Sequence, residues 1–337
     1  MITIDTNMDT NLLDEKKFHS IKSSLYNAEG ISYTEFKKTL KPVYSKVWLS
    51  IVLGWLLLLI TLMTGAYFIP HSHHVGLKLL FVMADAIFLG FIITYILNFF
   101  HEAGHYNIAS DKTSNDLLAN MFLGILIAQS IKQYRIVHWQ HHIKLGSTED
   151  TERSYFEALT PLFFIENLTG IRALKVFLFR NKKASAESQH KDSASAKSEA
   201  SIMLLAGLVF HLALLSIFIL TKTYWLLPVW IMGFGIFFPL FSSLRQLLEH
   251  RSEMADKKID YTIVEHGKIT RIFNNNLLAS MYGSAGFTRH LLHHLEPQIS
   301  YTNLNQLELF LQDTIIAPQL KKQKTSYLKA LRTLFGK

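Results

Sequence analysis

Four long runs of apolar residues dominate the pattern of this chain, and they lie at residues 47–69, 75–100, 201–220 and 224–243. A helix needs about 20 apolar residues to cross the hydrocarbon core of a bilayer, so each run is long enough. The pattern therefore predicts an all-α membrane protein with four transmembrane helices. A fifth run, residues 117–130, is too short to span and is expected to lie at the interface or to pack against the others.

Basic residues are nearly absent from two of the segments that connect these runs. The connections at residues 70–74 and 221–223 carry only Lys222, whereas 7 lysine and arginine residues precede the first run, 12 lie between the second and third, and 13 follow the fourth. Basic segments tend to stay on the cytoplasmic side of a membrane. We therefore expect two transmembrane hairpins, with both termini cytoplasmic and a cytoplasmic helical cap formed by the polar segments.

This arrangement predicts three regions along the chain. They are a cytoplasmic N-terminal segment at residues 1–46, a membrane domain at residues 47–305 and a cytoplasmic helical tail at residues 306–337. Within the membrane domain, residues 181–200 are rich in Ser, Ala and Lys and show no apolar periodicity. Such a composition buries too little apolar surface to fold, so we expect a flexible loop there.

Charge and composition narrow the class of protein further. The chain is 49% hydrophobic, has a formal net charge of +8 and contains no cysteine. The missing cysteines exclude disulfides, Cys-ligated zinc and Cys-ligated iron–sulfur clusters. The basic excess lies on the expected cytoplasmic face, where anionic lipid headgroups and an acidic redox partner would be attracted, so it requires no nucleic-acid partner.

Histidine residues form three clusters with internal spacings of one, three and four. The clusters are His101 and His105, then His138, His141 and His142, then His290, His293 and His294, and a ninth histidine, His250, follows the fourth run. On a helix, side chains three or four positions apart share a face, so each cluster can aim its imidazoles at one point. One tetrahedral zinc ion needs only about four ligands. Eight or nine imidazoles on one side of the membrane therefore predict a dinuclear metal centre.

Polar residues beside these histidines are candidates for orienting the imidazole rings. The acidic candidates are Glu102, Asp150, Glu249 and Glu296. Gln246 lies one helical turn before His250 and is expected to face the metal directly or through a water. Arg245 is expected to anchor one of the acids.

The three histidine clusters, in order between paired apolar runs, resemble those of the integral-membrane fatty acid desaturase and hydroxylase superfamily. The third box, His290-Leu-Leu-His293-His294-Leu-Glu-Pro297, and the element Arg245-Gln-Leu-Leu-Glu249-His250-Arg251 carry the resemblance in detail. It covers roughly residues 47–305. The resemblance implies an oxidoreductase with two non-haem iron ions held by the histidines, which uses O2 and two electrons to introduce a double bond into a fatty acyl chain taken from the bilayer.

The same resemblance bears on partners, location and the reaction. The chain has no His-Pro-Gly-Gly haem-binding motif, so a separate ferredoxin or cytochrome b5-type carrier is expected to supply electrons. The lack of an organellar signal and the short tail favour a bacterial inner membrane. A hydroxylase or ketolase that acts on a carotenoid, sphingoid or other lipid is the alternative on this scaffold.

Two further functions compete with the di-iron interpretation. The motif His101-Glu102-Ala-Gly-His105 also satisfies the His-Glu-x-x-His pattern of intramembrane zinc metalloproteases. Such proteases also need a later ligand, typically an aspartate followed by glycine, and the chain has no Asp-Gly pair. A metal transporter would place its ligands at the bilayer midplane on broken helices, whereas these histidines lie outside the spans.

Polar residues outside the clusters have structural explanations. His211, within the third run, is expected to be packed or hydrogen-bonded, and His266, in a polar stretch, to be solvated. The Asn274–Asn276 run is expected to cap a helix. Trp139 is expected either to pack or to line a substrate channel. Asp85 either contacts substrate or pairs with a polar neighbour.

Overall fold

The computed structural model describes residues 12–187 and 192–336, and the described chain is almost entirely helical. It forms two compact units. Unit 1 comprises the chain up to Val43, His141–Ala158 and the chain from Arg245 onward, and unit 2 comprises Tyr44–Gln140 and Leu159–Leu244. Helices α6 (Ile131–Lys144) and α11 (Phe238–His250) each begin in unit 2 and end in unit 1.

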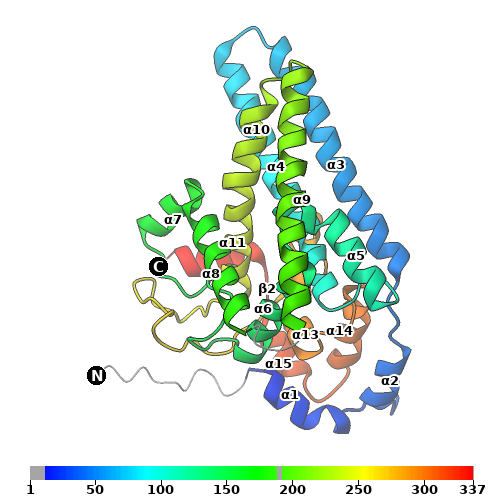
Figure 1. Cartoon of the computed structure of the whole chain (residues 1–337). Helices are drawn as coiled ribbons and strands as arrows, with labels where there is room; N and C mark the ends of the chain where they lie inside the picture. Colours follow the sequence, from blue (N-terminus) through cyan, green and yellow to red (C-terminus); the bar gives the residue numbers. More distant parts are fainter. Residues whose placement is uncertain (1–11, 188–191, 337) are drawn as a thin grey trace. The chain divides into compact units, whose positions relative to one another are not determined.

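Unit 2 contains the long apolar helices (Figure 1). Its other elements are α3 (Tyr44–His71), α4 (Val75–Gly104), α5 (Lys112–Phe122), η2 (Gly124–Ile127), α7 (Pro161–Leu168), α8 (Ile171–Glu187), α9 (Asp192–Leu220), α10 (Leu226–Met232) and the π-helical turn η3 (Gly233–Phe237). Four stretches of helix are long and apolar enough to cross a membrane: Tyr44–His71, Val75–Gly104, Ala196–Leu220 and Leu226–His250. The prediction of four transmembrane helices is therefore confirmed, although the helices run further than the apolar runs that predicted them.

Helix α4 is the centre of unit 2, because α3, α10 and η3 all pack against it. The fourth span approaches α4 so closely that a Cβ atom at Gly90 would overlap the Cβ of Phe237, and one at Gly233 would overlap Leu89. Large apolar side chains on the outer faces, such as Leu56, are exposed. Such faces suit contact with lipid tails rather than with water.

The expectation of a flexible loop at residues 181–200 is wrong for the residues that the structure describes. Residues 181–187 continue helix α8, and residues 192–200 form the first turns of α9, while 188–191 lie outside the described residues. Ala and Lys are good helix formers, so a polar segment without an apolar face can still extend two flanking helices. The short apolar run at residues 117–130 ends α5 and forms η2, which packs on α9.

Unit 1 gathers short elements from both ends of the chain. They are α1 (Glu15–Ile21), η1 (Lys22–Ser24), α2 (Tyr33–Thr39), β1 (Ile272–Phe273), α12 (Leu277–Tyr282), η4 (Phe287–Arg289), α13 (His290–Leu295), η5 (Tyr301–Asn303), α14 (Leu304–Gln312), α15 (Ala317–Lys322), β2 (Lys324–Thr325) and α16 (Tyr327–Phe335). Helix α12 is capped by the Asn276 side chain, which accepts the Ala279 N–H at 2.8 Å, as the asparagine run predicted.

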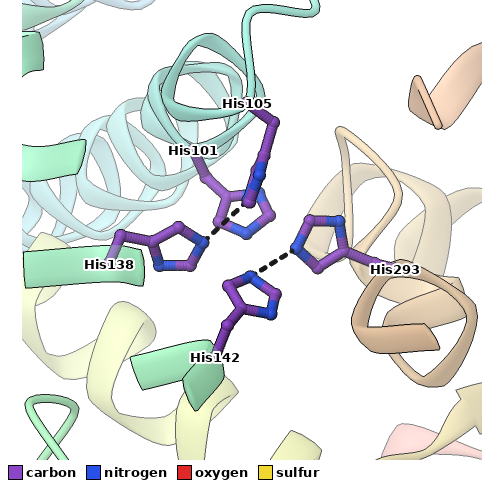
Figure 2. Close-up of side chains that lie close together, drawn as sticks. All are labelled: His101, His105, His138, His142 and His293. Carbon is purple, nitrogen blue, oxygen red and sulfur yellow. Dashed lines mark hydrogen bonds between the residues drawn. The ribbon is translucent and has the colours of Figure 1, made fainter. Parts of the chain in front are cut away.

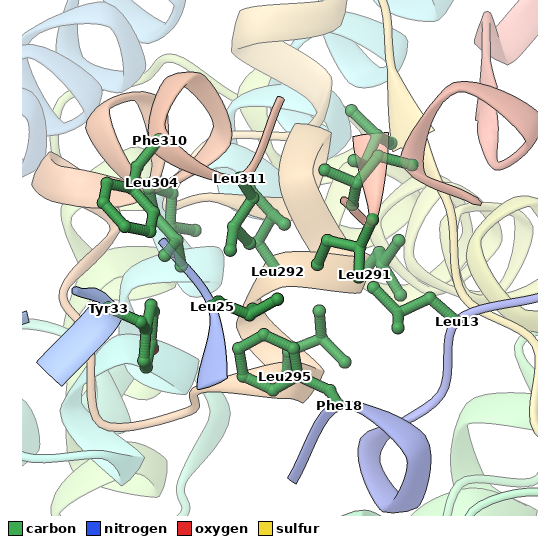
Figure 3. Packing of buried hydrophobic residues seen from close by; sticks show 14 of the residues in the cluster. Leu13, Phe18, Leu25, Tyr33, Leu291, Leu292, Leu295, Leu304, Phe310 and Leu311 are labelled. Atoms are coloured by element: carbon green, nitrogen blue, oxygen red, sulfur yellow. The ribbon is translucent and has the colours of Figure 1, made fainter. Parts of the chain in front are cut away.

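One hydrophobic core holds unit 1 together (Figure 3). Leu13, Phe18 and Leu25 from the N-terminal segment pack with Leu291 and Leu295 of α13 and with residues of α14. The tail also joins the unit through a parallel bridge, in which Ile272 pairs with Lys324. The expected N-terminal segment and C-terminal tail are thus not separate regions in space, because their apolar faces are buried against the helix that carries the third histidine cluster.

Candidate metal centre

Four helices carry the nine histidines, and in each helix the local sequence sets the direction of the rings. His101 lies in the last turn of α4, and His105 caps its end. Helix α6 presents the second cluster, and α11 ends at His250. Helix α13 is only six residues long, and all of its side chains are buried. All nine histidines are buried, with exposures between 1% and 6%, which requires that their ring nitrogens find partners inside the protein.

Three of these rings converge within unit 2. The Nε2 atoms of His105 and His138 lie 2.9 Å apart, and the ring of His101 is centred 4.5 Å from that of His138 (Figure 2). Tyr134 stacks in parallel on His138, and Trp139 packs edge-on against His105. These aromatic contacts fix the ring orientations, so the packing explanation for Trp139 is the one supported by a contact.

A second group of rings lies entirely within unit 1. It consists of His141, His250, His290 and His294, whose nearest ring nitrogens all lie within 4.8 Å of one another. The Nε2 atom of His290 is 2.9 Å from that of His250 and 3.2 Å from that of His294. Unit 1 also holds His142 and His293, whose Nε2 atoms are 3.2 Å apart (Figure 2).

The other ring nitrogen of three histidines in this group faces an oxygen. The Nδ1 of His141 is 2.9 Å from an Asp150 carboxylate oxygen, and the Nδ1 of His294 is 3.0 Å from Glu15. The Nδ1 of His250 is 3.1 Å from the carbonyl oxygen of Ile269. A carbonyl or carboxylate can only accept, so each Nδ1 must donate its proton.

The proton at Nδ1 determines whether the converging Nε2 atoms can bind a metal ion. A neutral imidazole protonated at Nδ1 carries a lone pair at Nε2. Three such lone pairs point toward one buried place in unit 1, where they repel one another unless a cation lies between them. An imidazole that binds a metal usually donates its other N–H to a carboxylate or a backbone carbonyl, which is the arrangement seen here. The donor set therefore fits a transition-metal ion.

Electrostatics supports the hydrogen bonds that His141 and His294 donate from Nδ1. Burial by itself lowers the pKa of His141, but the Asp150 carboxylate more than offsets this, so the net shift is upward. Burial raises the pKa of Glu15, but its hydrogen bond and charge interaction with His294 and the charges of Lys268 and His141 together outweigh burial, so the pKa is lowered overall. The Glu15 carboxylate thus acts as an ionised acceptor for the His294 N–H group.

The other predicted orienting residues lie near the rings in different roles. Glu249 accepts two hydrogen bonds from the Arg245 guanidinium, at 2.9 and 2.8 Å, and one of its oxygens is 3.9 Å from the Nε2 of His290. Arg245 thus anchors an acid, as expected. Gln246 donates instead to the Glu152 carboxylate. Glu102 is fully buried in α4 beside His101.

The expectation that Glu296 orients a histidine is not supported by any contact in the described chain, because its carboxylate forms ion pairs with Lys22 and Lys37. The expectation that His266 is solvated is wrong. It is buried between aromatic rings, and its Nε2 accepts the Ser252 N–H at 3.3 Å. His211 is hydrogen-bonded as expected, with Nε2 donating to the Leu126 carbonyl and Nδ1 accepting from Trp230.

Several residues that support the centre were not found from the sequence. Glu15 lies 279 positions before the histidine that it contacts, so no local spacing could reveal it. Tyr155 donates to Asp150 at 2.5 Å. Arg251 is 1% exposed and donates to the carbonyl oxygens of Tyr155, Glu157 and Asp256, which fixes the chain on both sides of Asp150 and His250. Of these three residues, only Arg251 could have been found from the sequence, because it directly follows His250.

The apolar helices and the buried rings together define an integral membrane protein with histidine clusters suited to bind metal. A model of the fatty acid desaturase family matches residues 77–329, which include all three clusters and His250. The chain therefore belongs to the fatty acid desaturase family. No curated protein gives a significant match.

Proposed function

We propose that this protein is an O2-dependent di-iron desaturase that introduces a double bond into the acyl chain of a membrane lipid. The observation that carries the proposal is the set of nine buried histidines, in which rings of unit 1 are held by acceptors at Nδ1 and leave Nε2 open to a metal. In the balanced reaction a –CH2–CH2– unit, O2, two electrons and two protons give –CH=CH– and two water molecules.

The number of ligands suggests how two iron ions would be shared. His141, His250, His290 and His294 form a set of four within unit 1 and would hold one ion. His101, His105 and His138 of unit 2 are candidate ligands for the second ion, and His142 and His293 of unit 1 are further candidate ligands. Bound iron supplies the redox chemistry and the open positions for O2.

The protein's own groups keep the iron ligands neutral and fixed. Asp150, Ile269 and Glu15 hold three rings in the Nδ1-protonated form, so that Nε2 is the ligand atom. Arg245 neutralises Glu249, whose oxygen lies close to His290, and stacks at 3.5 Å over the ring of Phe287. This pairing keeps a buried carboxylate from remaining as an unbalanced negative charge beside the centre.

Location and partners follow as parts of the same proposal. The distribution of lysine and arginine favours cytoplasmic termini and a cytoplasmic centre, and the membrane we propose is a bacterial inner membrane. The acyl substrate would enter from the bilayer, and a ferredoxin or cytochrome b5-type carrier would supply electrons. The zinc-protease alternative has no support beyond the His101–His105 motif, because it leaves the four-histidine group of unit 1 without a role.

The proposal is tested by lipid analysis in a host that lacks desaturases and is supplied with ferredoxin and its reductase. We expect new double bonds by gas chromatography–mass spectrometry with the wild type and with His73→Ala, which changes an exposed histidine. We expect none with His293→Ala. Metal content and thermal melting of each purified variant separate loss of iron from loss of the fold.

Other outcomes decide between this reaction and its alternative. New hydroxylated or oxidised lipids that disappear in His293→Ala would replace the desaturase proposal by a hydroxylase or ketolase. Unchanged lipids in hosts that make fatty acids, sphingoids and carotenoids, with an iron-loaded protein and a working donor, would refute lipid oxidation as the function.

A further inference from the structure

A basic cavity lies on unit 1, and residues of the C-terminal tail form part of its lining. Its volume is about 310 Å3. Its charged lining side chains are Arg271, Lys322, Lys324 and Lys329, opposed by a single acid, Glu253. Met254, also part of the lining, is 81% exposed and offers an apolar contact at the cavity. We call these residues the basic cavity.

Hydrogen bonds hold the tail in place, so the basic cavity is a fixed feature of the fold. The backbone of Ile272 donates to Gln323 at 2.9 Å, and that of Asn274 donates to Thr325 at 2.8 Å. The Gln323 side chain is buried, and it both donates to and accepts from the backbone of Leu13, at 3.0 and 2.9 Å. A single glutamine thus ties the N-terminal segment, the tail and the strand β1 together.

Two lysines of the basic cavity keep an uncompensated positive charge, whereas Lys324 forms an ion pair with Glu308 at 2.8 Å. Lys322 and Lys329 are exposed and have no carboxylate partner within the described residues. Arg271 is 5% exposed and donates to the carbonyl oxygens of Leu248 and Arg251, which do not cancel its charge. The tail from residue 314 to residue 337 contains six basic residues and no acidic residue. This face therefore attracts an acidic partner.

The wall of the basic cavity reaches a histidine of the metal site directly. Ile269 lines the cavity, and its carbonyl oxygen accepts the Nδ1–H of His250 at 3.1 Å. One residue and one hydrogen bond therefore separate the cavity from the imidazole. Electron transfer through protein weakens steeply with distance, so a redox group placed here would have a short path to the ion that His250 holds.

We propose that the basic cavity is the docking and electron-entry site for a small one-electron carrier protein with an acidic surface. The proposal rests on the proposed function, because the reaction consumes two electrons from outside. In each encounter one electron leaves the reduced carrier and enters the metal centre, and two encounters supply one turnover. The exposed methionine and the surrounding cations match the apolar centre and charged rim of a transient protein interface.

The test compares two double variants that change the net charge equally. In Lys322→Glu/Lys329→Glu both changes lie in the basic cavity, whereas in Lys321→Glu/Arg332→Glu two exposed residues of the same tail that do not line it are changed. The probe is a reduced [2Fe–2S] ferredoxin with an acidic surface, added to protein in nanodiscs. Its Kd and its kcat/KM as electron donor are measured at low and high salt, beside turnover driven by dithionite.

We expect the cavity variant to bind ferredoxin at least ~10-fold more weakly and to lose at least ~10-fold in kcat/KM for the donor at low salt. The tail control should change far less. The difference should shrink near 1 M salt, where the screening length is about 3 Å. Dithionite-driven turnover should be equal in all variants.

Equal ferredoxin binding in the two double variants would overturn the docking proposal. So would a cavity variant that raises the KM for the acyl lipid and not that for ferredoxin, since the cavity would then bind a phosphate-bearing substrate. Ferredoxin binding that depends on the cavity, together with no lipid product even from dithionite, would refute the desaturase proposal and leave the docking site standing.

Discussion

Asp150→Asn tests the argument that hydrogen bonds at Nδ1 prepare the histidines for metal. The Asp150 carboxylate accepts His141 Nδ1–H at 2.9 Å, the Tyr155 hydroxyl at 2.5 Å and the Glu152 backbone N–H at 2.8 Å. An asparagine of the same shape has one acceptor oxygen and turns its NH2 group toward one of these donors. At least one charge-assisted hydrogen bond is therefore lost, which is about 1.5–3 kcal/mol.

This magnitude translates into metal affinity. Loss of a partner that orients a metal ligand typically costs 10–100-fold in affinity, and tenfold corresponds to about 1.4 kcal/mol, so both estimates agree. We expect Asp150→Asn to release iron to a chromophoric chelator about 10–100-fold faster than the wild type. Thermal melting checks that the fold survives.

Asp111→Asn serves as the matched control. Asp111 caps α5 on the surface by accepting the Ser114 N–H, and asparagine caps a helix about as well as aspartate. Iron release from this variant should equal that of the wild type. If Asp150→Asn, still folded, also releases iron at the wild-type rate, hydrogen bonding at Nδ1 does not prepare the ligands and the reasoning is refuted.

Three further predictions concern the fold. Burial beside Arg251 and Arg271 lowers the pKa of His266 to about 3, so the unfolded chain takes up the proton first and stability is lost as the pH falls below about 6.5. His266 should contribute about 1.4 kcal/mol lost per pH unit there to the slope measured by melting, and His266→Gln should reduce the slope by that amount. Arg251→Lys leaves buried carbonyl groups without donors and should lower stability by about 2–4 kcal/mol in denaturation in detergent. Gly90→Val should prevent close packing on Phe237 and abolish folded yield, measured by size-exclusion chromatography, whereas Gly76→Val, in open space, should not.

The sequence predicted the spans and the histidine clusters because both signals are local. Apolar length identifies a span, and spacing of three or four identifies a helix face. It could not set the ends of the helices, because α4 and α11 continue from the apolar region into polar turns that carry His101 and His250.

Contacts between distant segments left no local signal. Glu15 contacts His294, and the Glu296 carboxylate forms ion pairs with Lys22 and Lys37. Composition was also misleading at residues 181–187 and 192–200, where flanking helices extend into a polar segment. These errors have the same origin, because each depends on a tertiary partner that spacing along the chain does not encode.

The π-helical turn η3 in the fourth span determines the directions in which the side chains after it point. In a π turn the hydrogen bonds close over one additional residue compared with an α-helix. If Gly233–Phe237 became regular α-helix with the number of residues unchanged, the remainder of the span would rotate by about 100°, since 3.6 residues make a turn. Arg245, Glu249 and His250 would all turn away from their present directions. Loss of the π turn without loss of a residue would therefore dismantle the metal site, and the number of residues in this span is matched to the π turn, a constraint that hydrophobicity alone does not reveal.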